Sequence, residues 1–176
     1  KQMFSDEHFR KKINMSGVNS INWARIICQI VYYFYAYFKI SSKVNFSVPT
    51  GNFGDVYAGY IAKKMGLPID KLIVATNEND ILCRVINSGE YRPSKVKPSL
   101  SPSMDIQVAS NFERLLFDVL NNDDQKVSKS MKDLNDNGFF KLEKDELKKI
   151  RENFSAEKIN DADTLRIIKD FFINYG

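Results

Sequence analysis

The sequence has few of the residues from which metal centres and disulfide frameworks are built. Among its 176 residues there is one histidine, His8, and there are two cysteines, Cys28 and Cys83. A single histidine excludes a multi-histidine metal site, and the two cysteines have neither metal-ligand spacing nor a disulfide framework. Both cysteines lie within apolar helical patterns, so we expect small buried side chains in a reducing cytosol and no metal.

Signals for membranes and nucleic acids are also scarce. The longest apolar run, 26–38, is shorter than the roughly 20 apolar residues of a membrane-spanning helix. With 26 Lys and Arg against 22 Asp and Glu, the net charge is only +4, and the basic residues form no stripe typical of nucleic-acid binding. Neither GxGxxG nor GxxxxGK[ST] is present, so nucleotide binding is poorly supported. No secretory signal is visible, and we expect a cytoplasmic protein without membrane or nucleic-acid partners.

What is present is sufficient for a hydrophobic core, since 43% of the residues are apolar. The most informative segment is 44–60, VNFSVPTGNFGDVYAGY. The β-type run at its start ends at Pro49, which has no amide hydrogen for strand pairing. A polar turn with Gly51 and Gly54 follows, and the pattern becomes helical from Asp55, which we expect to cap the helix. Such a turn favours a phosphate, because glycines admit close approach and helix N-termini attract anions; an ordinary strand-to-helix turn is the alternative.

The middle of the chain alternates between helix and strand patterns. The spacing predicts helices at about 22–38, 55–65 and 81–89, with strands at 44–48 and 71–75. The segment between the strands is long enough for a crossover helix, so the strands should be parallel. This order predicts an α/β fold, a three-layer αβα arrangement around a parallel sheet. Parallel strands end at one rim of the sheet, where the glycine turn and Asn77 should both lie.

The first of these helices is apolar on nearly every side, so we expect it to be covered on most sides. Its polar start differs from the rest. Asn19, Ser20, Asn22 and Arg25 gather at the positive end of the helix dipole, where they can cap the helix or receive an anion.

The last third of the chain is polar and helical. A proline-rich loop leads to an amphipathic helix near 108–119, with Asp105 as a possible cap. Further helices are expected at 124–134, 144–151 and 161–175, with a short strand at 139–140 and Asn160 or Asp161 capping the last helix. We expect an α/β domain at 1–120 and a small, mostly helical subdomain at 121–176.

Four stretches in the same order carry a more specific signal: NSINWARI at 19–26, VPTGNFGDVYAGYIAKKMGLP at 48–68, ATNENDIL at 75–82 and SPSMDIQVASNFERLLF at 101–117. Together they resemble threonine synthase, a pyridoxal-phosphate enzyme of fold type II, whose fold is similar to the tryptophan synthase β subunit. The resemblance implies a lyase of threonine biosynthesis that converts O-phospho-L-homoserine and water into L-threonine and phosphate.

The resemblance also implies roles for individual residues. The phosphate of pyridoxal 5'-phosphate would be held by the glycine turn, namely Gly51, Asn52, Phe53, Gly54 and Asp55. Successive backbone amides can hold a phosphate, which explains why the turn contains no Lys or Arg. Phe53 would pack to shape the turn. The substrate would lie near Asn19, Ser20, Asn22 and Asn77.

Two parts of the family's active site have no counterpart in this sequence. The Schiff-base lysine of threonine synthases lies in a domain well before the glycine turn, and no early lysine here matches its motif. The polar partner of the pyridine nitrogen lies after the small helical subdomain. We therefore expect an internal fragment with no catalytic residue of its own, inactive without the missing N- and C-terminal parts of the enzyme. Two alternatives stay open: another fold type II enzyme, such as a dehydratase or sulfhydrylase, and a non-catalytic phosphate-binding or interaction domain with a Rossmann-like core.

Overall fold

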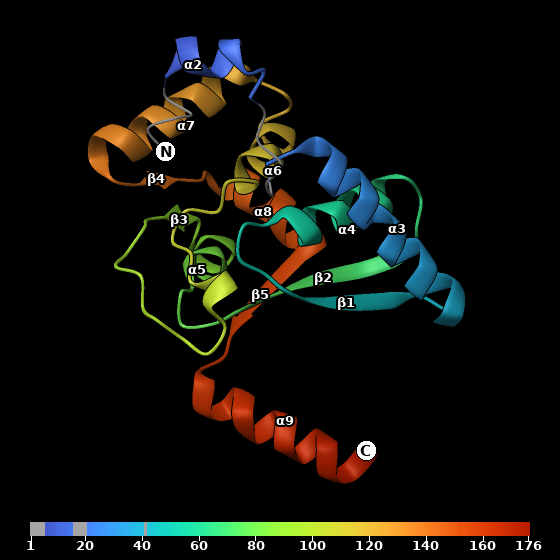
Figure 1. Cartoon of the computed structure of the whole chain (residues 1–176). Helices are drawn as coiled ribbons and strands as arrows, with labels where there is room; N and C mark the ends of the chain where they lie inside the picture. The colour runs from blue at the N-terminus through green and yellow to red at the C-terminus, as the bar shows by residue number, and fades with distance from the viewer. Residues whose placement is uncertain (1–5, 16–20, 41) are drawn as a thin grey trace.

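A computed structural model describes residues 6–15, 21–40 and 42–176 (Figure 1). Within these ranges, no helix is both long and apolar enough to cross a membrane. In chain order the elements are α2 (Glu7–Lys12), α3 (Trp23–Ile40), β1 (Val44–Pro49), α4 (Gly54–Lys64), β2 (Ile69–Thr76), α5 (Ile81–Ser88), β3 (Glu90–Tyr91), the 3-10 helix η1 (Pro102–Met104), α6 (Phe112–Val119), α7 (Asp124–Asn137), β4 (Phe140–Lys141), α8 (Lys144–Asn153), β5 (Phe154–Lys158) and α9 (Asp161–Tyr175).

The central sheet has three strands in the order β1–β2–β5. β1 and β5 pair with opposite edges of β2, and both pairs are parallel, as predicted for the first two strands. The register places Val48 beside Val74 and Val74 beside Ala156, and all three side chains are buried. Helix α4 provides the crossover that a parallel pair requires between β1 and β2. A separate antiparallel pair joins β3 to β4.

Helices pack around this sheet in layers. α4 contacts β1 and β2, whereas α5 and α8 contact β2 and β5. α3 packs mainly on α4, so it forms an outer layer on that side (Figure 1). This is the mixed α/β arrangement with a parallel sheet that the sequence pattern predicted.

An aromatic cluster joins the sheet to the turn before α4. The ring of Phe53 lies 5.5 Å from that of Phe112 and 5.6 Å from that of Phe154, between ring centroids. Each of these three side chains is at most 1% exposed. They come from the turn, from α6 and from β5, so the cluster connects three segments that are distant in the sequence.

The structure corrects the expected organisation of the last third. Helices α7, α8 and α9 lie close to their predicted positions, and Asn160 caps α9 by accepting from the amide of Asp163. Strand β5 was not predicted, because only Phe154 and Ala156 of its five residues are buried and the alternation is short. β5 belongs to 121–176, the expected helical subdomain, yet it completes the sheet. The boundary at 120/121 therefore does not coincide with the edge of the sheet.

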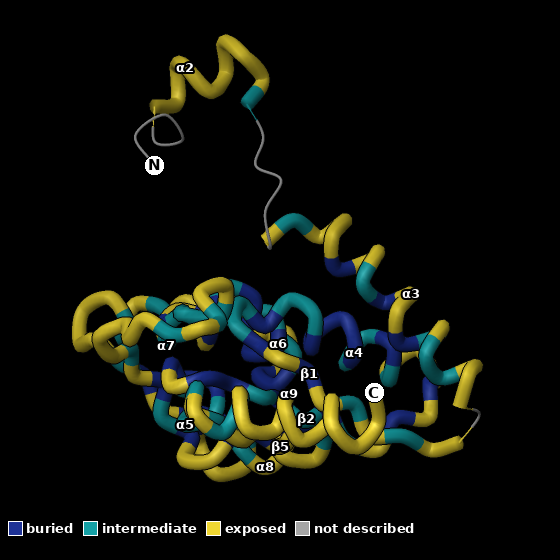
Figure 2. Tube along the Cα trace, turned by 60° about the horizontal axis from the view of Figure 1, so that its bottom comes forward, coloured by how far each residue is buried: buried dark blue, intermediate teal, exposed yellow. Residues whose placement is uncertain are grey.

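The expectation that α3 is covered on most sides was wrong for the described chain. Its buried residues are Ile26, Ile30 and Tyr33, whose spacing places them on one side of the helix, and α3 packs mainly on α4. Much of the rest of α3 is coloured as exposed in Figure 2. The opposite side exposes large apolar residues: Ile27, Val31, Tyr32, Tyr35 and Phe38. Cys28 is also exposed and Cys83 is half-buried, so the prediction of two buried thiols was wrong for Cys28. The sequence pattern shows that a helix has apolar residues on nearly every side, but it does not show which of those sides other segments cover.

Candidate anion-binding site

The turn between β1 and α4 is shaped by a strained residue held by the core. Phe53 has a left-handed backbone, with φ of +67°, and stands at the N-cap of α4 without a side-chain capping bond. The expectation that Asp55 caps this helix was therefore wrong, since Asp55 lies inside the first turn. The conformation of Phe53 is unusual for a residue with a side chain, and burial of its ring holds it there. This confirms that Phe53 packs to shape the turn.

The turn leaves a series of backbone amides available. Among the described residues, the N–H groups of residues 51–56 donate no hydrogen bond to another protein group. The first amides of any helix lack intrahelical acceptors, and the amides of the preceding turn extend the series here. The start of the turn is fixed instead by Thr50, whose amide donates to Ala75 O at 2.8 Å and whose hydroxyl donates to Val48 O at 2.6 Å. Successive amides around a left-handed residue form a concavity that suits an anion.

This concavity is closed on one side by α3. Residues 49–55 line a pocket of about 130 Å³ together with Arg25 and Gln29. These two residues are four positions apart, so they lie on the same face of α3. The guanidinium of Arg25 and the N-terminus of α4 both favour negative charge there. The pocket is smaller than the roughly 300–1,000 Å³ of typical small-molecule sites, so it suits an anionic group such as phosphate and not a whole cofactor.

The structure brings some predicted site residues together and not others. Asn19 and Ser20 lie outside the described residues. Asn22 accepts from the amide of Ala24 at 2.9 Å and lines a shallow pocket that shares Arg25 and Gln29 with the turn. The sequence pattern placed Arg25 in a polar cluster at the start of this helix, whereas Gln29 was not predicted as a site residue. Their four-residue spacing was the available signal.

Asn77 lies at the end of β2, on the rim where the sequence placed it. Its amide group donates to Ser99 Oγ and to Asp105 Oδ1 at 2.8 Å each. Its carbonyl oxygen accepts from the amide of Asn79 at 2.9 Å. The side chain is buried, and its amide and carbonyl groups both bond within the fold, so in this structure Asn77 organises the rim.

Asp105 is the centre of this rim network and not a helix cap. Helix α6 begins only at Phe112, with Asn111 at its N-cap. The carboxylate of Asp105 instead accepts from Ser99 Oγ at 2.7 Å, from the Ser99 amide at 2.9 Å and from Asn79 Nδ2 at 3.0 Å. The hydroxyl of Ser99 and these other donors lower the pKa of Asp105. These hydrogen bonds fix the proline-rich loop that contains Ser99 and Asp105 beside the carboxyl ends of the strands.

The same loop packs closely against the glycine turn at Gly51. A Cβ added at Gly51 would lie 3.1 Å from both Ser103 O and Ile106 Cδ1, and 3.3 Å from Met104 Cα. The amide of Asn111 also donates to Asn52 O at 3.1 Å. A side chain at position 51 would therefore crowd the loop, and the rim network and the turn pack together as one unit.

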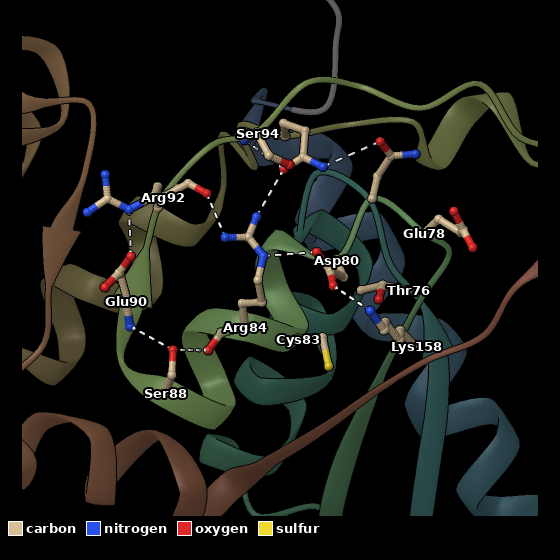
Figure 3. Close-up of polar contacts among 12 residues, drawn as sticks. Thr76, Glu78, Asp80, Cys83, Arg84, Ser88, Glu90, Arg92, Ser94 and Lys158 are labelled. Carbon is tan, nitrogen blue, oxygen red and sulfur yellow. Dashed lines mark hydrogen bonds and ion pairs between the residues drawn. The ribbon is translucent and has the colours of Figure 1, made fainter.

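A second polar layer braces the same loop (Figure 3). Asp80, at the start of α5, accepts from Arg84 Nε at 2.9 Å and from Lys158 Nζ at 3.0 Å. Arg84 also donates to Arg92 O and Gln107 Oε1 in the loop. Burial raises the pKa of Asp80, but the hydrogen bonds from Lys158 and Arg84 outweigh it and hold that pKa below its ordinary value. These contacts tie the end of β5 and the loop to α5.

No protein-family model matches the chain. Its sequence is 48% identical to the threonine synthase of Saccharomyces cerevisiae over 98% of this chain, which corresponds to 36% of that enzyme. It is 45% identical to the threonine synthase of Pseudomonas aeruginosa over the whole chain and 38% of that enzyme. The chain thus spans little more than a third of the curated relatives it matches.

Solved structures agree with the sequence relatives. The structure of a PLP-bound threonine synthase from Brucella melitensis superposes with a TM-score of 0.88, at 51% identity over 90% of this chain and 35% of that chain. The yeast threonine synthase superposes with a TM-score of 0.90, at 46% identity over 97% of this chain and 36% of that one.

The fold and its strand–turn–helix site therefore define a part of a fold type II enzyme, the pyridoxal-phosphate class with an αβα core. Within that class, the chain is homologous to a part of the threonine synthases, over nearly its whole length. This confirms the resemblance seen in the sequence, which extends over essentially the whole chain. The named relatives favour this family over the dehydratase and sulfhydrylase alternatives.

Proposed function

We propose that this chain is the segment of a threonine synthase that holds the phosphate group of pyridoxal 5'-phosphate. The observation that carries the proposal is the series of backbone amides at 51–56 that donate to no protein group among the described residues. Residues 51–55 of this series line a pocket together with Arg25. The amides of Gly51, Asn52, Gly54 and Asp55 would hold the phosphate, and Phe53 would keep the turn in shape. The pocket suits the phosphate group alone, so the ring of the cofactor would lie outside it.

In the whole enzyme we propose the lyase reaction of threonine biosynthesis, from O-phospho-L-homoserine and water to L-threonine and phosphate, in the cytoplasm. Pyridoxal phosphate supplies an electron sink when bound, and this chain contributes binding and orientation. The substrate contacts proposed from the sequence are Asn19, Ser20, Asn22 and Asn77. Because the Asn77 side chain already bonds to the loop, its contribution would be to shape the rim on which substrate lies.

The proposed partner of this chain is the remaining polypeptide of the same enzyme. No lysine here is matched to the family's cofactor-binding lysine, so the chain alone should be inactive. Two exposed apolar faces support a larger assembly: the outer side of α3, and α9, which has no buried residue and exposes Ile168, Phe171 and Phe172. In this proposal residues 1–120 are part of the cofactor-binding domain, and 121–176 combine β5 with the smaller helical unit.

The proposal is tested by comparing pyridoxal phosphate with pyridoxal, which lacks the phosphate group, in the whole enzyme. Gly54→Val should weaken binding of pyridoxal phosphate and leave pyridoxal binding nearly unchanged, since a branched side chain would intrude on the turn. Asn52→Ala should have a milder effect, because it removes at most one neutral hydrogen bond of about 0.5–1.5 kcal/mol. Equal affinity of wild type and Gly54→Val for pyridoxal phosphate would mean that the turn is only a connection. Threonine formation by the purified 176-residue chain alone would contradict the expected inactivity.

A further inference from the structure

We propose that Tyr33 of α3 is a positioning residue for the anion site, which holds the first turn of α4 so that its amides face a phosphate group. The inference rests on the proposed function, because it assumes that the turn binds phosphate. Tyr33 is not part of the turn: it lies within α3, and strand β1 separates that helix from the turn in the chain.

Tyr33 is held against α4 by close packing. Its side chain is 4% exposed, and its ring meets that of Phe46 edge-on with 4.9 Å between centroids. On the α4 side the ring lies over Gly59, where an added Cβ would be only 2.5 Å from Tyr33 Cε1. The absence of a side chain at Gly59 is therefore what lets the ring reach the first turn of α4.

The hydroxyl of Tyr33 donates to the backbone oxygen of Asp55 at 3.0 Å. That carbonyl and the amide of Val56 belong to one planar peptide unit and point in opposite directions. A hydrogen bond that fixes the carbonyl therefore also fixes the Val56 N–H, which points toward the N-terminal end of α4. Accepting this bond also polarises the peptide unit and strengthens the N–H as a donor.

The same hydroxyl also contacts the carboxyl group of Asp55, which lies beside the pocket. Asp55 Oδ1 lies 3.4 Å from it, and Asp55 lines both the turn pocket and a groove shared with Tyr33 on the β1 side. A carboxylate turned into the pocket would repel phosphate, whereas the guanidinium of Arg25, which also lines the pocket, would attract it. Burial raises the pKa of Tyr33, so its hydroxyl keeps its proton and remains a donor. The contact thus gives the Asp55 carboxyl group a hydrogen-bond donor on α3.

The test uses Tyr33→Phe in the whole enzyme, since this change removes the hydroxyl and keeps the ring. The readout is the ratio of the affinities for pyridoxal phosphate and pyridoxal, measured by absorbance titration. Loss of one hydrogen bond should reduce that ratio by roughly two- to tenfold, with pyridoxal affinity unchanged. Tyr35→Phe is the matched control, because Tyr35 lies on the same helix and is 67% exposed, and it should leave the ratio unchanged.

Gly59→Ala is a second variant that should lower the same ratio by displacing the ring. An unchanged ratio in Tyr33→Phe would overturn the inference, and so would an equal loss for both ligands, which would show a packing role only. A different result would overturn the proposed function itself. If the wild-type enzyme binds pyridoxal as tightly as pyridoxal phosphate, the turn contributes no phosphate site, and Tyr33 has none to position.

Discussion

Phe53 combines a strained backbone with a buried ring, and two substitutions separate these contributions. Phe53→Ala and Phe53→Gly both remove the ring from its contacts with Phe112 and Phe154, a loss of about 3–5 kcal/mol for a buried phenylalanine. Alanine keeps the cost of the left-handed backbone, which is about 1–2 kcal/mol for an L-residue. Glycine avoids that cost, although its greater freedom in the unfolded chain usually makes it about 0.5–1 kcal/mol less stable than alanine.

The balance of these two effects reverses the usual order at this position. Phe53→Gly should have a free energy of unfolding about 0.5–1 kcal/mol higher than Phe53→Ala, with both well below wild type. Urea denaturation followed by circular dichroism measures the difference. The control is the same pair at Phe112, which is equally buried, has no positive φ and begins α6, so that Phe112→Ala should be the more stable there. If Phe53→Gly is no more stable than Phe53→Ala, the left-handed turn stores no strain and the account of its shape is wrong.

Two further predictions concern the surroundings of the turn. Gly59→Ala should destabilise the protein, because overpacking against Tyr33 and Leu72 costs about 1–3 kcal/mol and helix propensity returns only about 1 kcal/mol, which leaves a net loss of up to about 2 kcal/mol; a raised melting temperature would contradict this. Asp105→Asn should be destabilising at neutral pH, because the carboxylate accepts several hydrogen bonds and its folded pKa is lowered. A lowered folded pKa contributes stability above the unfolded value of about 4, and this contribution is lost as the pH falls through the folded pKa. The difference between wild type and variant in urea denaturation should therefore shrink in acid, and a pH-independent difference would count against a role for the charge.

Much of the candidate site could be read from adjacent residues. The turn 51–55 is contiguous, and its glycines, its preceding proline and the following helical pattern identify it without any tertiary information. Arg25 and Gln29 could not be assigned to it in the same way, because their approach depends on how α3 packs on α4. The role of Asp105 was also misread, since a carboxylate before an apolar run is equally suited to a cap and to a loop network.

The sequence by itself determined the local elements around the site. Pro49 comes where β1 ends, and Gly66 and Gly89 follow α4 and α5 with positive φ, because each residue's own covalent structure restricts or frees its backbone. The sequence also indicated the homologous enzymes, the threonine synthases, through four motifs in the same order. Only the tertiary structure decided that β5 joins the sheet, that one face of α3 is exposed and that Tyr33 reaches Asp55. Strand pairing and burial depend on partners far away in the chain, so no local pattern specifies them.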